Sequence, residues 1–167
     1  AYTFNTSGGF LTLTIANTGV LANFWNINAD GNWTTGSNWS LGSAPNGAGA
    51  FANFGGGGAT ITAPRTVTLD ANQTVGSIGF NSAQSYTISG ANTLTLDNGA
   101  DPTAQISDTN GSHTLGVNLA QGGAVTNTQF NVVNAADTLT FAGVLSGATG
   151  LQKLSAGNLV LSGANTY

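Results

Sequence analysis

The chain has 167 residues and a net charge of −4, and only 5% of its residues are charged, against roughly 25% in an average soluble domain. Its two basic residues, Arg65 and Lys153, cannot supply the phosphate contacts that nucleic acids require or the attraction that anionic membranes require. Cysteine is absent, which excludes disulfides, thiol catalysis and thiolate metal sites. No apolar run approaches the ~20 residues that span a bilayer, so we expect no membrane insertion. Because 40% of the residues are hydrophobic, we expect the chain to fold.

Apolar residues alternate with threonine along the chain, and this period of two is typical of β-strands. The pattern begins at Leu11, Leu13 and Ile15. It recurs in three later segments, Val67–Leu69, Leu94–Leu96 and Leu139–Phe141, and Leu159 and Leu161 flank Val160 with the same spacing. Threonine is β-branched and suits the outward face of a strand, and clusters of Asn, Asp and Gly between the segments predict turns. The sequence therefore predicts an all-β fold.

Three regions follow one another along the chain. We predict a leading strand pair in 1–19, an aromatic-rich cap in 24–54 and a repeating body in 59–167, with the main boundary after residue 58. The cap region holds all three tryptophans, and the run Gly55–Gly58 that follows it is typical of a flexible joint or an exposed loop tip. An atypical end is expected in a repeat protein, because the terminal unit must cover an open edge.

The body repeats at a regular distance. Strand centres recur at intervals of roughly twenty to twenty-five residues, near Val67, Ile88, Leu115, Leu139 and Leu159. This spacing favours a β-solenoid, in which one coil contains two or three short strands, over a β-sandwich, the alternative that we keep, whose turns come more often. The pentapeptide Ser-Gly-Ala-Asn-Thr occurs at Ser89–Thr93 and at Ser162–Thr166. We predict that it marks a corner of the coil, with Leu-x-Leu as the buried edge beside it.

The closing segment, Gly150–Tyr167, resembles the autotransporter-associated β-strand repeat, a passenger motif of large bacterial surface and secreted proteins. It has the glycine-leucine-x-lysine start of that repeat, and Gly157–Tyr167 follows its GxLxLSGANTY core. The aromatic region is similar to a segment that often precedes such repeats, on these residues: Trp25-Asn26, Gly31-Asn32-Trp33, Asn38-Trp39, Pro45 and Ala50–Phe54. The resemblance implies a right-handed parallel β-helix, an extracellular or cell-surface location, a role in adhesion or fibre formation, and a repeat that continues beyond Tyr167.

Few residues are candidates for chemistry, and we predict no catalytic residue. His113 is the only histidine, and Asp108 is its nearest carboxylate in sequence, but no Gly-x-Ser-x-Gly motif accompanies them. We interpret His113 as a polar residue on a strand face, and the aspartates beside turns as turn residues. Calcium is the one cofactor to consider, because Asp97–Asp101 and Asp108–Asn110 offer oxygen ligands at alternate positions. Neither stretch completes a known calcium loop, so we predict no metal site.

Two functions remain open at this point. The charge-poor repeat body favours a non-enzymatic structural or adhesive module that associates with itself, head to tail or by strand addition. Its assembly strand would hold Phe10, Leu11, Leu13 and Ile15. The alternative is a carbohydrate-binding module for surface glycans in which Trp25, Trp33 and Trp39 form a stacking platform. The competing interpretation of these tryptophans is that they form the core of the cap.

Overall fold

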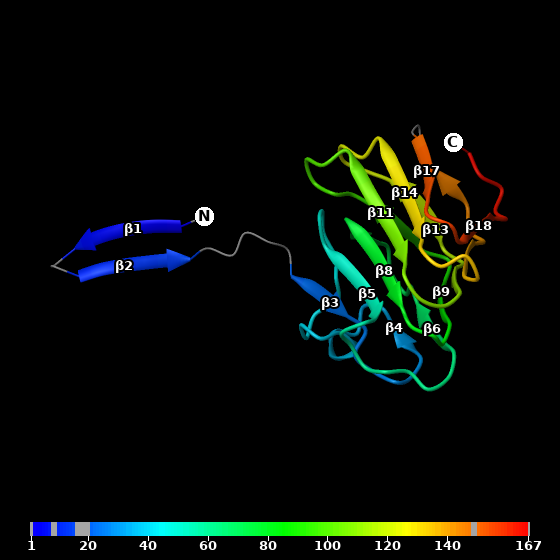
Figure 1. Cartoon of the computed structure of the whole chain (residues 1–167), viewed down its shortest axis with the longest axis horizontal. Helices are drawn as coiled ribbons and strands as arrows, with labels where there is room; N and C mark the ends of the chain where they lie inside the picture. Colours follow the sequence, from blue (N-terminus) through cyan, green and yellow to red (C-terminus); the bar gives the residue numbers. More distant parts are fainter. Residues whose placement is uncertain (1, 8–9, 16–20, 148–149, 167) are drawn as a thin grey trace.

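The computed structural model describes residues 2–7, 10–15, 21–147 and 150–166. The first two segments form β1 (Tyr2–Ser7) and β2 (Phe10–Ile15), which pair antiparallel as a two-stranded sheet of their own. Figure 1 shows this hairpin as a blue arm beside the main body. The predicted strand at 10–15 is therefore present, with its backbone paired to β1. Its addition to another sheet stays a prediction.

The body is a β-solenoid of about five turns built from three parallel sheets (Figure 1). The first sheet has six strands: β3 (Ala22–Phe24), β5 (Phe51–Gly55), β8 (Ser77–Asn81), β11 (Thr103–Asp108), β14 (Asn127–Val132) and β17 (Gly150–Leu154). The second sheet has another six: β4 (Gly31–Asn32), β6 (Arg65–Thr68), β9 (Tyr86–Ser89), β12 (His113–Leu115), β15 (Thr138–Phe141) and β18 (Asn158–Leu161). The third sheet has four: β7 (Gln73–Val75), β10 (Thr93–Leu96), β13 (Asn118–Gln121) and β16 (Leu145–Ser146). This confirms the all-β solenoid and removes the sandwich alternative.

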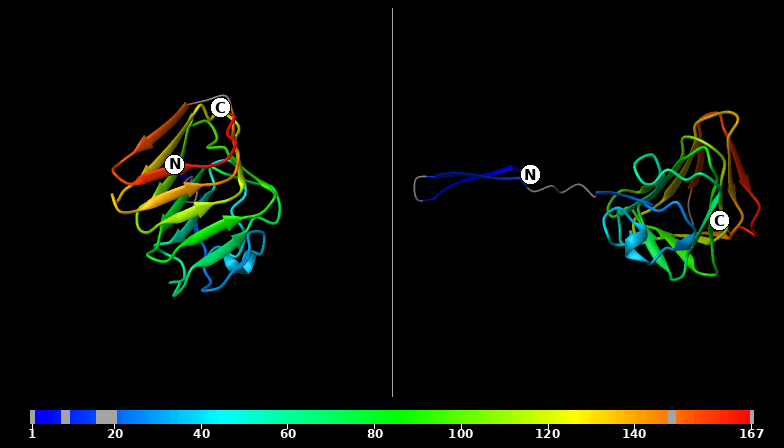
Figure 2. Two further views of the ribbon diagram at one scale, coloured as in Figure 1. Left: turned by 90° about the vertical axis from the view of Figure 1, so that its right-hand side faces the viewer. Right: turned by 90° about the horizontal axis from the view of Figure 1, so that it is seen from below.

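Each complete rung of the solenoid contains one strand from each sheet. The five strand centres predicted from the sequence all lie in the second sheet, one on each strand from β6 to β18. Within it, Val67 lies opposite Ile88, Ile88 opposite Leu115, and Leu139 opposite Leu159. The apolar segments at these five centres therefore form one edge of the coil, seen once per rung, whereas Leu94–Leu96 lies on β10 of the third sheet. Figure 2 shows the rungs stacked along the axis of the body.

Inward and outward positions alternate along the long strands of the first sheet from β5 to β14, as the period of two predicts. In β11, for example, Ala104, Ile106 and Asp108 are buried and the residues between them are half-buried. Amide side chains form a ladder on the outer face of the first sheet. Gln105 Nε2 donates to Gln129 Oε1 at 3.5 Å, and Gln129 Nε2 donates to Gln152 Oε1 at 3.0 Å. Uncharged amides can stack in register where like charges would repel, which explains the low charge of the chain.

Both copies of the pentapeptide lie at the same corner, between the second and third sheets. Ser89–Thr93 joins β9 to β10, and Ser162–Thr166 follows β18 and bridges back to β16 through Thr166 and Ser146. Asparagine side chains satisfy backbone groups of the adjacent rung: Asn92 Nδ2 donates to the Leu69 carbonyl at 2.7 Å, and Asn165 Oδ1 accepts from the Leu145 amide at 2.9 Å. The predicted corner is confirmed.

Glycines at this corner let successive rungs approach closely. A Cβ on Gly143 would lie 1.9 Å from the Val117 carbonyl oxygen, whereas a Cβ on Gly116, one rung earlier, would meet its nearest neighbour, the Ile88 oxygen, at 3.4 Å. We expect Gly143→Ala to lower the free energy of unfolding by about 1–3 kcal/mol because the backbone must shift. Gly116→Ala is the matched control and should change it by less than about 0.5 kcal/mol. Urea unfolding measures both, and an equal cost at the two sites would contradict the close-approach argument.

The N-terminal end of the body is closed. Backbone amides of the segment between β4 and β5 donate to the first complete rung and beyond: Trp33 N to Thr68 O at 2.8 Å, Gly47 N to Thr74 O at 2.7 Å, and Gly49 N to Asp97 O at 2.8 Å. The two ends of the glycine run at the end of β5 lie against neighbouring backbone. A Cβ on Gly55 would lie 2.2 Å from Asn81 O, and one on Gly58 would lie 2.1 Å from Trp25 O. These contacts require glycine at positions 55 and 58, while Gly56 and Gly57 are exposed, which fits the exposed loop tip that the composition suggested rather than the flexible joint.

Candidate functional site

The three tryptophans form the interior of the cap. Trp25, Trp33 and Trp39 are 0%, 0% and 2% exposed. Trp39 is central: its ring centroid lies 5.3 Å from Trp25, 5.0 Å from Trp33 and 5.6 Å from Phe54. The indole N–H groups donate inside the cap, from Trp39 to the Trp33 carbonyl at 2.7 Å and from Trp33 to the Pro45 carbonyl at 3.1 Å. A buried ring cannot stack on a sugar, so the glycan platform at these residues is wrong and the core interpretation is correct.

Aromatic rings continue from the cap along the interior of the solenoid. Phe54 stacks on Phe80 at 5.3 Å, and Phe80 stacks on the imidazole of His113 at 4.7 Å with an interplanar angle of 13°. These residues lie on β5, β8 and β12 in three successive rungs. His113 is therefore a core ring at the end of an aromatic column. The sequence placed it correctly at the start of a strand but did not predict that it faces inward.

The imidazole of His113 is held in one neutral tautomer. Its Nδ1 accepts a hydrogen bond from the Tyr86 backbone N–H at 3.0 Å, and its Nε2 lies 2.9 Å from the Asn110 carbonyl oxygen, to which it donates. Protonation of Nδ1 would set two N–H groups against each other. Burial lowers the pKa of His113, against smaller opposing effects of the Asn110 carbonyl and of the Asp137 carboxylate. Geometry and burial therefore both favour the uncharged ring.

Asp108 is the second titratable group in the interior. It is 0% exposed, and neither of its carboxyl oxygens accepts a hydrogen bond of normal geometry from the described residues. Burial, with the charge of Asp137, raises its pKa to about 7, and the Asn110 backbone N–H offsets part of the shift. Its Oδ1 lies 3.8 Å from His113 Nε2. The structure thus brings together the two residues that the sequence paired, but it seals both from solvent, so neither can reach a substrate.

The first stretch considered for calcium, Asp97–Asp101, uses its carboxylate oxygens within its own turn. Asp97 Oδ1 accepts from the Gly99 amide at 2.9 Å, and Asp101 Oδ1 accepts from the Thr103 amide at 2.9 Å. In the part of the chain that the structure describes, no three His, Cys, Asp or Glu residues gather as a metal site would require. The turn bonds explain both aspartates as turn residues.

The C-terminal end of the solenoid differs from the capped end. β17 and β18 are the last strands of their sheets, and among the described residues no strand pairs with their far sides. Four of their residues occupy inward positions: Leu151, Lys153, Leu159 and Leu161. The three leucines are only half-buried, and Lys153, which lies opposite the buried Phe130, is exposed. We call these four residues the open rim.

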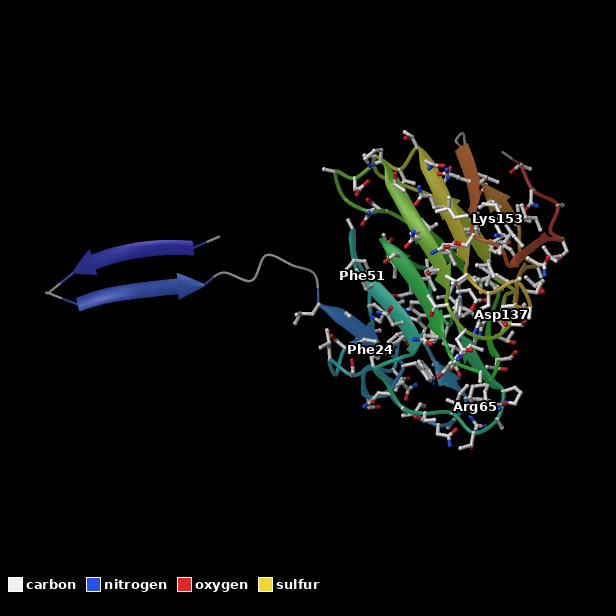
Figure 3. All side chains as sticks on the ribbon, in the orientation of Figure 1. Phe24, Phe51, Arg65, Asp137 and Lys153 are labelled. Carbon is white, nitrogen blue, oxygen red and sulfur yellow. The ribbon has the colours of Figure 1, made fainter. Side chains whose placement is uncertain are left out.

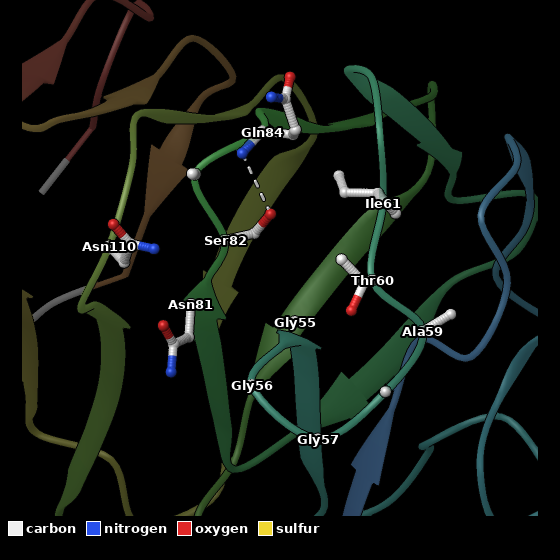
Figure 4. A pocket seen from close by; sticks show the side chains of 12 residues that line it. Gly55, Gly56, Gly57, Ala59, Thr60, Ile61, Asn81, Ser82, Gln84 and Asn110 are labelled. Atoms are coloured by element: carbon white, nitrogen blue, oxygen red, sulfur yellow. Dashed lines mark hydrogen bonds between the residues drawn. The ribbon is translucent and has the colours of Figure 1, made fainter.

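A surface groove lies at the corner between the first and second sheets, around the glycine run. On one side is a cleft of about 540 Å³ between the loops 55–61 and 81–84 (Figure 4). On the other side is a cleft of about 270 Å³ over the outer face of the first sheet, and Gly55, Gly56 and Asn81 line both. Sequence reasoning missed this site. The glycine run was its one visible signal.

Comparison with protein-family models, with curated proteins and with solved structures finds no match to this chain. The class of protein is therefore defined by the structure itself, which is a β-solenoid of parallel sheets with an aromatic cluster at its N-terminal end. In the residues that the structure describes, no helix has the length and apolar character needed to cross a membrane.

Proposed function

We propose that the chain is a non-enzymatic structural or adhesive module of a bacterial autotransporter-like protein, placed outside the cell or on its surface, that assembles with further copies. The repeat resemblance of Gly150–Tyr167 and the uncharged surface ladders support the proposal. The observation that carries it is the difference between the two ends of the solenoid. The cap closes one end, while the open rim offers backbone groups of edge strands and half-buried leucines to a further rung.

In the purified chain of 167 residues, the occupant that we propose for the open rim is a second copy, which would take the place of the further rung that a continuing repeat would supply. An edge strand with free backbone groups pairs readily with another strand, and a head-to-tail contact that does not close generates a filament. Candidate complementary surface exists near the cap, where Leu21, Leu41 and Phe51 are 57%, 49% and 37% exposed around a shallow cleft of about 270 Å³. Such a patch on a folded chain is typical of an interaction surface.

Lys153 controls how favourable that contact is. It occupies the inward column of Ile78, Ile106 and Phe130, and these residues of the three preceding rungs are all apolar. Its ammonium donates to the carbonyls of Leu154 and Ser155 at the corner. An inward-pointing lysine on an edge strand opposes edge-to-edge pairing, because covering the ammonium removes it from water. Association through the rim must therefore accommodate this charge.

We expect Lys153→Leu to strengthen self-association of the purified chain by at least about tenfold, since it extends the apolar column into the rim. Light scattering after size exclusion, over a series of concentrations, measures the change, and negative-stain electron microscopy shows whether the product is a filament. Gln152→Leu is the matched control: it places the same leucine on the outward face of the same strand and should leave association unchanged. Monomers of both wild type and Lys153→Leu at about 1 mM would overturn the proposed assembly.

A further inference from the structure

The groove around Gly55–Gly58 has the composition of a binding site for an uncharged polar ligand. Its lining contains glycine, amide and hydroxyl groups, a few apolar side chains and one surface aromatic ring, and none of the lining residues of either cleft is charged. Figure 4 shows Asn81, Gln84 and Asn110 around the larger cleft. Asn81 ends β8, and Gln84 and Asn110 lie in the corner loops of two successive rungs, so only the folded solenoid brings the three together.

These three amides differ from the amides at the corner between the second and third sheets. Asn72, Asn92, Asn118 and Asn165 each form a hydrogen bond with backbone of an adjacent rung. The side chains of Asn81, Gln84 and Asn110 form none with the described residues, and all three line the same cleft. Hydrogen bonding between rungs therefore explains the four bonded asparagines. It does not explain the three unbonded amides at the cleft. Each free carboxamide offers one acceptor and two donor hydrogens, the pattern that matches sugar hydroxyls.

Phe24 supplies the aromatic surface of the smaller cleft. It is half-buried at the end of β3 (Figure 3). Its ring rests on the glycine run, since a Cβ on Gly57 would lie 2.7 Å from Phe24 Cε1. The floor beside it is flat because β8 contributes Gly79, where a Cβ would meet Asn53 Oδ1 at 2.6 Å. A partly exposed ring next to amides on a flat floor can pack against the apolar face of a pyranose while the amides bind its hydroxyls.

We infer that this groove binds a neutral oligosaccharide, with Phe24 as the stacking ring and Asn81, Gln84 and Asn110 as the hydrogen-bonding side chains. Neutrality follows from the lining, which offers no cation to a carboxylate or sulfate group and no carboxylate to an amine. The site is separate from the buried tryptophans and from the open rim. Its test is therefore independent of self-association.

The test is titration calorimetry of the purified chain with cellohexaose, maltohexaose, xylohexaose and chitohexaose. We expect at least one of them to bind, and the double substitution Asn81→Ala with Asn110→Ala to weaken that binding by about tenfold or more. These side chains are exposed and unbonded, so the melting temperature should not change. Phe24→Leu keeps an apolar side chain but removes the ring, and it should weaken binding by a similar factor.

The matched control is Asn26→Ala, another exposed amide without a side-chain hydrogen bond that lies outside both clefts. It should bind as the wild type does. Failure of all four sugars to bind, or equal affinity of the wild type and the double variant, would overturn the inference. So would binding of a neutral Ser/Thr-rich peptide in place of the sugars, if the double substitution abolished it.

Discussion

Replacement of Trp39 by alanine is expected to lower the free energy of unfolding by about 3–5 kcal/mol. Trp39 is 2% exposed and contacts the rings of Trp25, Trp33 and Phe54. Its loss would leave a cavity at the centre of the cap. It would also remove the indole N–H that donates a hydrogen bond to the Trp33 carbonyl. Urea unfolding followed by circular dichroism measures the change. Because a solenoid is stabilised rung by rung, the rungs next to the cap should unfold before those near β18 in the Trp39→Ala variant.

The control for this substitution is Leu41→Ala, in the same segment of the chain. Leu41 is 49% exposed, so its truncation should cost less than about 0.5 kcal/mol. A Trp39→Ala variant as stable as the Leu41→Ala variant would show that the tryptophan cluster does not hold the end of the solenoid closed. In that case the buried position of these rings would need another explanation.

Asp108→Asn is expected to make the protein more stable at alkaline pH, by on the order of 4 kcal/mol at pH 8. The pKa of Asp108 is raised from 3.8 to about 7 in the folded state. A raised carboxyl pKa contributes stability that is fully present below the unfolded value and is lost as pH rises through the folded one. The advantage of the variant should therefore be small at pH 4, grow up to about pH 7 and then level off. Urea unfolding across this pH range measures it.

The titration of His113 changes the free energy of unfolding with pH in the opposite direction. Its effect must be distinguished from that of Asp108. Burial lowers the pKa of His113 below 6.5, so its contribution is present above pH 6.5 and is lost as pH falls. The Asp108→Asn variant should still lose the stability contribution of His113 as pH falls below 6.5. Asp101→Asn is the control, because the exposed amide can still accept from Thr103, and its pH profile should follow the wild type. A stability difference between Asp108→Asn and wild type that does not vary with pH would contradict a neutral, buried Asp108.

The fold could be predicted because each repeat has a recognisable pattern over a few consecutive residues. Leu159 and Leu161 alternate with polar or outward residues, and the pentapeptide after them combines glycine for close approach with asparagine for backbone bonding. These properties depend on neighbours in the chain and on one adjacent rung. The inward position of Lys153 could not be predicted in the same way. It follows from the register between β14 and β17, which pairs Lys153 with Phe130.

The candidate site was beyond the reach of the sequence for a similar reason. Asn81 and Asn110 are 29 positions apart in the chain. In the sequence they resemble any other turn residues, because the residue type does not show whether the side-chain amide is hydrogen-bonded in the fold. The tryptophans misled one hypothesis because a cluster of aromatic residues can serve a surface or a core equally well. Only packing distinguishes these uses, and in this fold Phe54 and Phe80 continue the cluster inward.

The closed cap and the open rim also give the folding process a direction. Contacts between rungs join residues only about 25 positions apart, so each rung can form on the one before it without a long loop closure. The large aromatic cluster at the N-terminal side offers the most apolar surface for a nucleus. Growth from that nucleus would proceed toward β18, in the order in which the ribosome delivers the chain. Each newly added rung would then serve as the template for the next.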